Sequence, residues 1–331
     1  MSRTARSLAG LYGCNHGGVR GAQPHPPTAA LAHNRTTASP CYHYRVFRRK
    51  TTGSVVCPSC GSLVGVRDDR CYTCGRANPG LWGFAPLLRQ LGSDFGFVPI
   101  VVGGSSVLYV LTLLLSGSNM EVVGGGFSFL SPSGQVLLMF GASGWVPVFL
   151  MGRWWTLLSA SWLHGNLLHI LFNMLWVRDL GPSSVDLIGP ARTIIIYTVS
   201  GACGFAVSTL AGLMLGGLPI PILRGGGITL GASASIFGLL GALVHYGRKS
   251  GSSFIRGQAM QYAVVLFVFG LFMPGIDNYA HAGGFLGGYG VSAIVNPLTR
   301  ERGDHMLIAI GCLVATVLAI LFSVLSPLPV R

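Results

Sequence analysis

From residue 97 onward, long apolar stretches alternate with short polar ones. Seven of these stretches are suited to cross about 30 Å of hydrocarbon as helices, and they cover residues 97–116, 166–178, 193–215, 231–247, 259–275, 278–296 and 306–325. The second is short by itself, but Trp154, Trp155 and Trp162 precede it, which is typical of a chain that approaches through the membrane interface. The pattern therefore predicts an all-α polytopic membrane domain over residues 97–331.

The stretch 135–151 is an eighth candidate, but Gly141, Gly144 and Pro147 interrupt it. We interpret it as a re-entrant or interfacial part of a long first loop over residues 117–165. Positive charge tests this choice, because the cytoplasmic loops of membrane proteins are enriched in Lys and Arg. With seven spans and a cytoplasmic N-terminus, the segments after the first span carry seven basic residues inside and three outside. An eighth span would reverse every later loop and lose this agreement.

Composition separates the membrane domain from a polar, basic N-terminal region. Only 9% of the residues are charged, against about 25% in a soluble globular domain, and twelve of the 22 Lys and Arg residues precede residue 96. Residues 1–52 are rich in Gly, Pro, Ala, Thr and Arg, so we expect a disordered tail there. Residues 81–96 are expected to form a juxtamembrane linker. The net charge of +13 does not predict a nucleic-acid partner, because the positive residues lie in this region and between apolar runs.

Between tail and linker, residues 53–80 contain two CxxC pairs, Cys57-Pro-Ser-Cys60 and Cys71-Tyr-Thr-Cys74. Each pair offers two thiolates to one tetrahedral ion, and two pairs complete a Cys₄ zinc site. So short a segment cannot build a stabilising core, so metal would supply its folding energy. Two disulfides or a redox CxxC are the alternatives, but a cytoplasmic location disfavours disulfides, and redox motifs do not usually come in pairs. The spacing predicts a zinc ribbon with a structural Zn²⁺.

Polar residues inside membrane spans are costly and mark functional sites. His169 and Asn173 are four residues apart near the start of the second span, Ser233 lies near the start of the fourth, and His281 lies near the start of the sixth. In the predicted topology all three spans enter from the outer face. Each of the three residues His169, Ser233 and His281 is expected about four residues after its helix begins, which is roughly 6 Å below that end. We expect these side chains to share one depth.

Small residues offer a route to contact between the fourth and sixth spans. His281, Gly284 and Gly288 follow an i, i+3, i+7 stripe, and a matching stripe consists of Ala234, Gly238 and Gly241. Such stripes let two helix backbones approach closely, which would bring the Ser233 hydroxyl within hydrogen-bond reach of His281. Because Ser233 lies one position away from its stripe, we expect the first turn of that helix to be irregular or rotated.

Three ordered motifs resemble the rhomboid family of intramembrane proteases over residues 150–296. They are His164…His169…Asn173 on the second span, Gly231-Ala232-Ser233 opening the fourth, and Ala280-His281-Ala282-Gly283-Gly284 opening the sixth. The resemblance implies a six-helix core, to which this chain adds one C-terminal helix. It also implies that Ser233 is the nucleophile and His281 the general base, in a dyad without the carboxylate of a triad. His169, Asn173, Gly231 and the Ser233 backbone N–H would stabilise the oxyanion.

Two departures from the family pattern matter. Ser235 follows the nucleophile position by two residues and is a rival, although it lies about 200° further round the helix. Many members carry Trp-Arg in the first loop, whereas Thr156 stands at the arginine position here, which puts the anchoring of the loop in doubt. We expect a structural role for His164 and a helix cap at Asp277. Two further histidines, His245 and His305, are expected to be solvated.

The resemblance implies an intramembrane serine endopeptidase that cleaves single-span or polytopic membrane proteins near the outer face. It needs no cofactor for catalysis. A transporter is one alternative, but it would show internal repeats and acidic residues at mid-membrane. A catalytically silent rhomboid-like protein that binds or chaperones membrane proteins is the other, although such proteins lose the Ser or the His. Short loops and a compact ribbon favour a bacterial cytoplasmic membrane.

Overall fold

A computed structural model describes residues 49–58, 60–86, 96–120, 129–218, 224–273 and 275–328. The predicted tail up to residue 48 and residues 87–95 of the predicted linker lie outside this set. All described residues belong to one compact unit that extends from Phe47 to Arg331.

The cysteine-containing segment forms a two-stranded antiparallel sheet. Strand β1 (Ser54–Val56) pairs with β2 (Leu63–Gly65), with Val55 opposite Val64. A short helical turn, η1 (Leu81–Gly83), follows the second CxxC pair. The buried cluster of this segment is small and consists of Val55, Cys57, Val64, Val66, Cys71 and Ala85. So few apolar side chains bury little area, which is the reason a metal was predicted here. We call residues 49–86 the ribbon.

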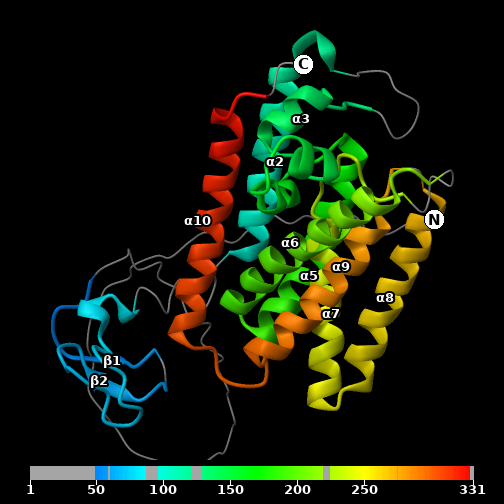
Figure 1. Cartoon of the computed structure of the whole chain (residues 1–331). Coiled ribbons are helices and arrows are strands. Elements are labelled where there is room, and N and C mark those ends of the chain that lie inside the picture. The colour runs from blue at the N-terminus through cyan, green and yellow to red at the C-terminus, as the bar shows by residue number, and fades with distance from the viewer. Residues whose placement is uncertain are drawn as a thin grey trace, which may run out of the picture. The chain divides into compact units, whose positions relative to one another are not determined.

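Seven long helices follow, as the hydrophobic pattern predicts: α2 (Phe97–Ser116), α5 (Leu167–Ile188), α6 (Pro190–Leu215), α7 (Ser233–Ser250), α8 (Ser253–Phe272), α9 (Asn278–Val295) and α10 (Gly303–Leu325). By length and composition, four of them can cross a membrane: α2, α6, α8 and α10. The other three carry His169, Ser233 and His281 and are shorter, more polar or richer in glycine. Figure 1 shows α8 and α10 flanking a bundle whose centre contains α6, α7 and α9.

Residues 129–165 of the first loop contain only short pieces of helix, so the stretch 135–151 does not form one span. Helix α3 (Gly134–Phe140) ends at Gly141, whose φ of 102° suits glycine. A single π-helical turn, η3 (Val146–Leu150), comes next. The loop closes with α4 (Thr156–Ser159) and the 3₁₀ turn η4 (Ala160–Trp162), which lead into α5.

Two predictions about polar residues are wrong. The second span does not end at residue 178, because α5 continues to Ile188 with a buried face that includes Val177 and Leu180, while Arg178 and Asp179 lie exposed. A charged residue does not end a helix when it lies on the exposed side of an amphipathic continuation.

The two histidines predicted to be solvated are both bonded within the protein. His245 is buried, and its Nδ1 lies 2.9 Å from the Ser292 hydroxyl. His305 is half-buried, and its Nδ1 accepts a hydrogen bond from Arg192 Nε at 3.2 Å. Partners far away in the sequence satisfy both rings, which local polarity could not reveal.

Glycines bring α7 and α9 into backbone contact. A Cβ atom added at Gly284 would collide with the Ala234 carbonyl, and one added at Gly288 would collide with the carbonyl of Gly238. The same glycine stripes appear in the sequence, and close packing of membrane helices depends on such small residues. This contact sets the separation of the two helices that carry Ser233 and His281.

Candidate active site

Ser233 is the first residue of α7 and follows a sharp turn at Gly231. Gly231 has a φ of 123°, a conformation that favours glycine, and its N–H donates to the Ala160 carbonyl at 2.9 Å. A side chain there would also strike His169, since an added Cβ would lie 2.5 Å from its Nε2. The expectation that Ser233 lies four residues inside its helix is therefore wrong. The unusual backbone lies at Gly231, two residues before α7 begins, and not in the first turn of the helix as expected.

His281 reaches Ser233 from the fourth residue of α9. Its Nε2 lies 3.0 Å from the Ser233 hydroxyl oxygen, although the two residues are 48 positions apart in the chain. The imidazole is 6% exposed and stacks on Phe237, with ring centroids 4.2 Å apart and an interplanar angle of 13°. Within the described part of the chain, Nδ1 has no hydrogen-bond partner. Stacking on an aromatic ring thus orients this histidine, where a carboxylate does so in a triad.

Phe237 was not predicted from the sequence. It lies four residues after Ser233, on the same side of α7, and this spacing is the only sequence signal that points to it. Its contact with His281 depends on how α7 and α9 pack, so the spacing alone does not distinguish Phe237 from an ordinary core residue.

His169 faces the turn before Ser233. Its Nδ1 accepts a hydrogen bond from the Gly165 N–H at 3.4 Å, and its backbone N–H donates to Asn166 Oδ1 at 2.7 Å, which caps α5. An imidazole that accepts at Nδ1 carries its proton at Nε2 when neutral. This Nε2 lies next to the position that a Cβ atom at Gly231 would occupy. The Nε2 edge of the ring therefore lies beside the turn that precedes the serine.

Asn173 lies one turn further along α5, on the same face. It is buried, and its Nδ2 donates to the His169 carbonyl at 2.8 Å. One amide hydrogen is thus bonded within α5, and a second remains on the same nitrogen. The His164 ring is also buried and packs edge-on against His169, with centroids 5.1 Å apart. Both ring nitrogens of His164 are buried without a hydrogen-bond partner among the described residues, so its structural role stays a prediction.

Ser235, the rival nucleophile, lies away from His281. It is fully buried, and its hydroxyl donates to Ser161 Oγ in η4 at 3.3 Å. The hydroxyl of Ser233, by contrast, is bonded to the imidazole. The geometry therefore favours Ser233 over Ser235.

Asp277 caps α9, as predicted, since its Oδ1 accepts from the Ala280 N–H at 3.0 Å. Its other carboxylate oxygen bonds to the Ser208 hydroxyl of α6, and Ser208 accepts from the Gly226 N–H at 3.3 Å. One carboxylate thus joins α6 and the segment before Ser233 to the turn that carries His281.

The first loop is anchored without an arginine at position 156. Thr156 is buried, and its hydroxyl donates to the Arg153 carbonyl at 2.7 Å and lies 3.3 Å from Ser143 Oγ. Ser143 in turn pairs through its backbone with Thr229, two residues before Gly231. The doubt about anchoring is resolved, because Thr156 and Ser143 connect the loop to the serine turn.

The four ribbon cysteines form a separate cluster whose sulfurs all lie within 4.8 Å of one another. Cys57 and Cys74 Sγ are 3.8 Å apart, and Cys60 and Cys71 Sγ are 3.6 Å apart. A disulfide would need about 2.05 Å. Four sulfurs at about 2.3 Å from a tetrahedral ion lie about 3.8 Å from one another. The cluster can therefore hold one metal ion.

Two of the four thiols have shifted pKa values, and the shifts go in opposite directions. Hydrogen bonds with the Ser62 side chain and backbone lower the pKa of Cys60 to about 6. The Arg76 backbone lowers the pKa of Cys74, but burial and the neighbouring thiols outweigh it and raise that pKa to about 12. Deprotonated sulfurs at this spacing repel one another, and a bound dication would remove the repulsion.

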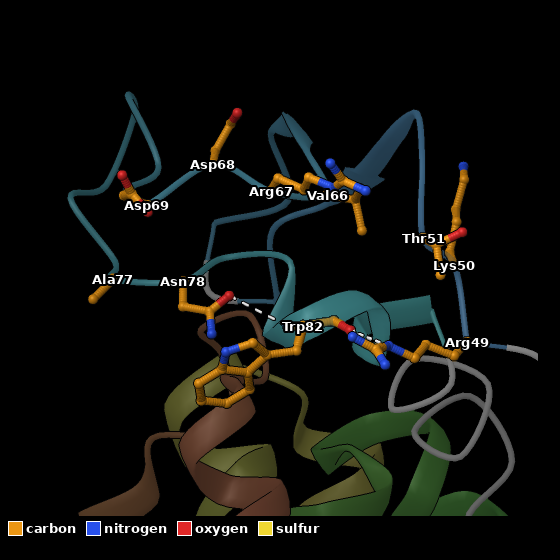
Figure 2. Close-up of a pocket in the computed structure, with 10 residues that line it drawn as sticks. All are labelled: Arg49, Lys50, Thr51, Val66, Arg67, Asp68, Asp69, Ala77, Asn78 and Trp82. Atoms are coloured by element: carbon orange, nitrogen blue, oxygen red, sulfur yellow. Dashed lines mark hydrogen bonds between the residues drawn. The ribbon is translucent and has the colours of Figure 1, made fainter.

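The ribbon also contains a pocket of about 450 Å³. Figure 2 shows Arg49 and Lys50 on one side, Asp69 and Ala77 on the other, and the Trp82 ring between them. Two hydrogen bonds hold the backbone of Trp82: Arg49 Nε donates to its carbonyl, and its backbone N–H donates to Asn78 Oδ1. None of the lining residues belongs to the predicted Ser–His site.

Comparison with known proteins agrees with the arrangement of the helices. The profile of the rhomboid domain matches residues 151–298, which contain all three motifs. RHOMBOID-like protein 7 of Arabidopsis thaliana is 30% identical over 237 residues, covering 66% of this chain and 72% of that protein. Rhomboid protease GluP of Bacillus subtilis is 28% identical over 224 residues, covering 66% of this chain and 40% of that protein.

A third relative bears a different description. Inactive RHOMBOID-like protein 8 of Arabidopsis thaliana is 26% identical over 239 residues, covering 65% of this chain and 64% of that protein. These relatives come from a plant and a bacterium, so they do not support a bacterial origin over another. The ordered motifs, the helical bundle and the extent of similarity agree, and the chain belongs to the rhomboid family of integral membrane proteins.

Proposed function

We propose that this rhomboid is an intramembrane serine endopeptidase in which Ser233 is the nucleophile and His281 the general base. The observation that carries the proposal is the 3.0 Å contact between Ser233 Oγ and His281 Nε2. A hydroxyl is a weak nucleophile by itself, and a base within hydrogen-bond reach activates it. The other reading is a structural hydrogen bond between two helices. It would not need a second imidazole beside the same turn, yet His169 lies there.

The reaction divides into two steps. Ser233 Oγ attacks the substrate carbonyl as His281 Nε2 takes its proton, and the proton passes to the leaving amine as the C–N bond breaks. Water then attacks the acyl ester, His281 takes a proton from the water, and Ser233 regains it as the new acid departs. Negative charge on the carbonyl oxygen is stabilised by donors that are already in place. The candidates are His169 Nε2–H, the Ser233 N–H and the remaining amide hydrogen of Asn173. Gly231 would contribute by shaping the turn, since its own N–H donates to the Ala160 carbonyl.

The substrate would be a membrane protein, single-span or polytopic, cut near the outer membrane face. All three site helices carry their functional residue within the first four positions, so the site lies close to one end of the bundle. A carbonyl inside a substrate helix is hydrogen-bonded and shielded, so the helix must unwind locally before attack. The excess of basic residues in alternate loops supports a cytoplasmic N-terminus and an outer site.

The alternative, a catalytically silent binding protein, applies to rhomboids that have lost a reacting group. One relative of this chain is described as inactive. Here both groups are retained and lie at hydrogen-bond distance, with the base held by a stacked ring. These contacts favour the enzyme.

We further propose that residues 53–80 are a zinc ribbon, held by one structural Zn²⁺ on Cys57, Cys60, Cys71 and Cys74. All four ligands are thiolates, which zinc accepts in closed structural sites. None of the four cysteines contributes to the proposed chemistry, so hydrolysis needs no metal.

The test is cleavage of a model transmembrane substrate by the purified full chain in lipid, together with labelling by a fluorophosphonate probe. We expect wild type and Ser235→Ala to cleave and to be labelled, and Ser233→Ala to do neither. Ser235→Ala is the matched control, since it removes a hydroxyl two residues away. Labelling that survives Ser233→Ala would contradict the proposed nucleophile, and an inert wild type would support the silent alternative.

A further inference from the structure

Arg153 is a buried cation in the first loop. It is 2% exposed, and no salt bridge to it is found in the described part of the chain. Its Nη1 donates to the Leu138 carbonyl of α3 at 2.6 Å, and its Nη2 donates to the Ser323 carbonyl of α10 at 2.5 Å. Burying a charge is costly unless fixed partners compensate. Two backbone carbonyls from separate elements provide part of that compensation, while Nε is buried without a partner among the described residues.

The neighbouring Trp155 contacts the same turn of α10. Its indole Nε1 donates to Ser323 Oγ at 2.9 Å, and its ring packs against Phe322 with centroids 4.3 Å apart. The end of α3 also approaches, since a Cβ added at Gly141 would lie 2.6 Å from Ser323 Oγ. Ser323 is fully buried by these contacts. Two segments of the first loop, residues 153–155 and the end of α3, therefore converge on one turn of the C-terminal helix.

A short chain of hydrogen bonds leads from this turn to the catalytic serine. The Arg153 carbonyl accepts from the backbone N–H of Thr156, where α4 begins, at 3.1 Å. The segment formed by α4 and η4 ends in two contacts with the serine turn. The Ala160 carbonyl accepts from the Gly231 N–H, and Ser161 accepts from Ser235. The loop segment that α10 holds is thus the segment that positions the residues on both sides of Ser233.

We infer that Arg153 is a positioning residue and that its bond to the Ser323 carbonyl of α10 fixes the α4–η4 segment against the Ser233 turn. The inference rests on the proposed peptidase function. The seventh helix would then be part of the catalytic framework, in addition to the six-helix core. Arginine suits this role because its planar guanidinium donates to two acceptors in different directions at once. A lysine ammonium is a compact point charge on a flexible stem and would not hold both carbonyls in a fixed geometry.

Four variants test the inference in the full-length protein. Arg153→Met keeps much of the side-chain volume but removes both bonds, and Arg153→Lys keeps the charge. Ser323→Ala removes only the acceptor for Trp155 and leaves the carbonyl that Arg153 uses. Thr316→Ala is the matched control, because the Thr316 hydroxyl is buried in the same helix but bonds only to the Cys312 carbonyl within α10.

Cleavage kinetics give the first readout. We expect Arg153→Met to lower kcat by about 10- to 100-fold with KM nearly unchanged, since misplacing a reacting group slows chemistry more than binding. The rate of fluorophosphonate labelling should fall in parallel. Arg153→Lys should recover part of the loss, Ser323→Ala should show a smaller loss, and Thr316→Ala should match wild type. Arg153→Met could instead unfold at a lower temperature while it keeps the wild-type kcat and labelling rate. That result would overturn the inference and leave Arg153 with a structural role only.

Hydrogen exchange gives a readout that does not need activity. Arg153→Met should speed exchange in peptides that cover 156–162 and 229–233, while Thr316→Ala should not. If wild type neither cleaves nor is labelled, the proposed function fails, and the exchange result still decides whether Arg153 holds the segment. Unchanged exchange at 229–233 would refute the positioning role. If Arg153→Met does not fold, Arg153→Lys takes its place, because a lysine cannot hold both carbonyls in a fixed geometry. Exchange at 156–162 and 229–233 that stays at the wild-type rate in Arg153→Lys would then overturn the inference.

Discussion

The ribbon and the helix bundle are held together by different forces. The ribbon buries only a handful of apolar side chains, and two of them are cysteines of the metal cluster. The bundle buries large apolar side chains such as Phe205, Leu239 and Leu240, and it brings α7 and α9 together through glycines. We therefore expect a bound ligand to supply the stability of the ribbon, whereas side-chain packing supplies that of the bundle.

Polar groups also serve opposite purposes in the two regions. In the ribbon, four thiols converge on a point that one ion can occupy. In the bundle, a hydroxyl and imidazoles converge on a point where a substrate carbonyl would lie. A cluster of polar side chains stabilises a fold when each polar group has a partner. It can catalyse a reaction when a substrate can enter and take the place of one partner. The following predictions separate the two regions, from the largest expected effect to the smallest.

Metal removal should unfold the ribbon and leave the bundle intact. Structural zinc sites contribute about 10–16 kcal/mol of apparent binding free energy in small peptides, far more than the ribbon core can replace. Chelation or Cys71→Ser should expose residues 49–86 to limited proteolysis and abolish metal content, while labelling of Ser233 persists. Cys203→Ser, a cysteine outside the cluster, is the control for metal content. Loss of labelling on chelation would show that the two regions are not separate.

His281→Ala should abolish activity without affecting the ribbon. Loss of a general base costs about 10²–10⁴ in rate, or roughly 3–5 kcal/mol of transition-state stabilisation. Cleavage of the model substrate should fall by that factor, and metal content should remain that of wild type. His245→Ala provides the matched control, since it removes another buried imidazole that bonds to Ser292. If both variants lost a similar fraction of cleavage activity, the cause would be damage to the fold, and the role of His281 as general base would not be supported.

Gly288→Ala should destabilise the bundle, because its new Cβ would strike the Gly238 carbonyl of α7. Overpacking of this kind costs about 1–3 kcal/mol. The control is Gly290→Ala on the same helix, where an added Cβ meets nothing within 4 Å. That variant should be neutral or slightly more stable, since alanine favours helix by up to about 1 kcal/mol. Thermal unfolding in detergent measures both, and equal stability of the two variants would contradict the close α7–α9 contact.

Ser235→Ala should have the smallest effect. It removes one buried hydrogen bond between neutral groups, worth about 0.5–1.5 kcal/mol. Thermal unfolding should shift slightly, and cleavage should stay within about twofold of wild type. A large loss of cleavage at unchanged stability would return Ser235 to consideration as the nucleophile.

Much of the architecture follows from the sequence. Apolar stretches separated by polar ones located all seven helices, although only four of the helices are long and apolar enough to cross a membrane by those criteria alone. Paired CxxC spacing located the cysteine cluster. Both signals are local. The glycine stripes predicted that α7 and α9 would pack closely against each other. This signal is local as well, because each glycine is identified from the sequence alone. The end of α5 was missed because apolar length says nothing about an amphipathic continuation.

The tertiary structure alone decided the details of the site. The stacking of Phe237 on His281, the bond of Asp277 to Ser208 and the contact of Arg153 with Ser323 each join residues far apart in the chain. No local pattern specifies such pairs, because the partner of a buried polar or aromatic group is set by how helices pack. Sequence determines which residues must be buried, and packing determines which of them meet.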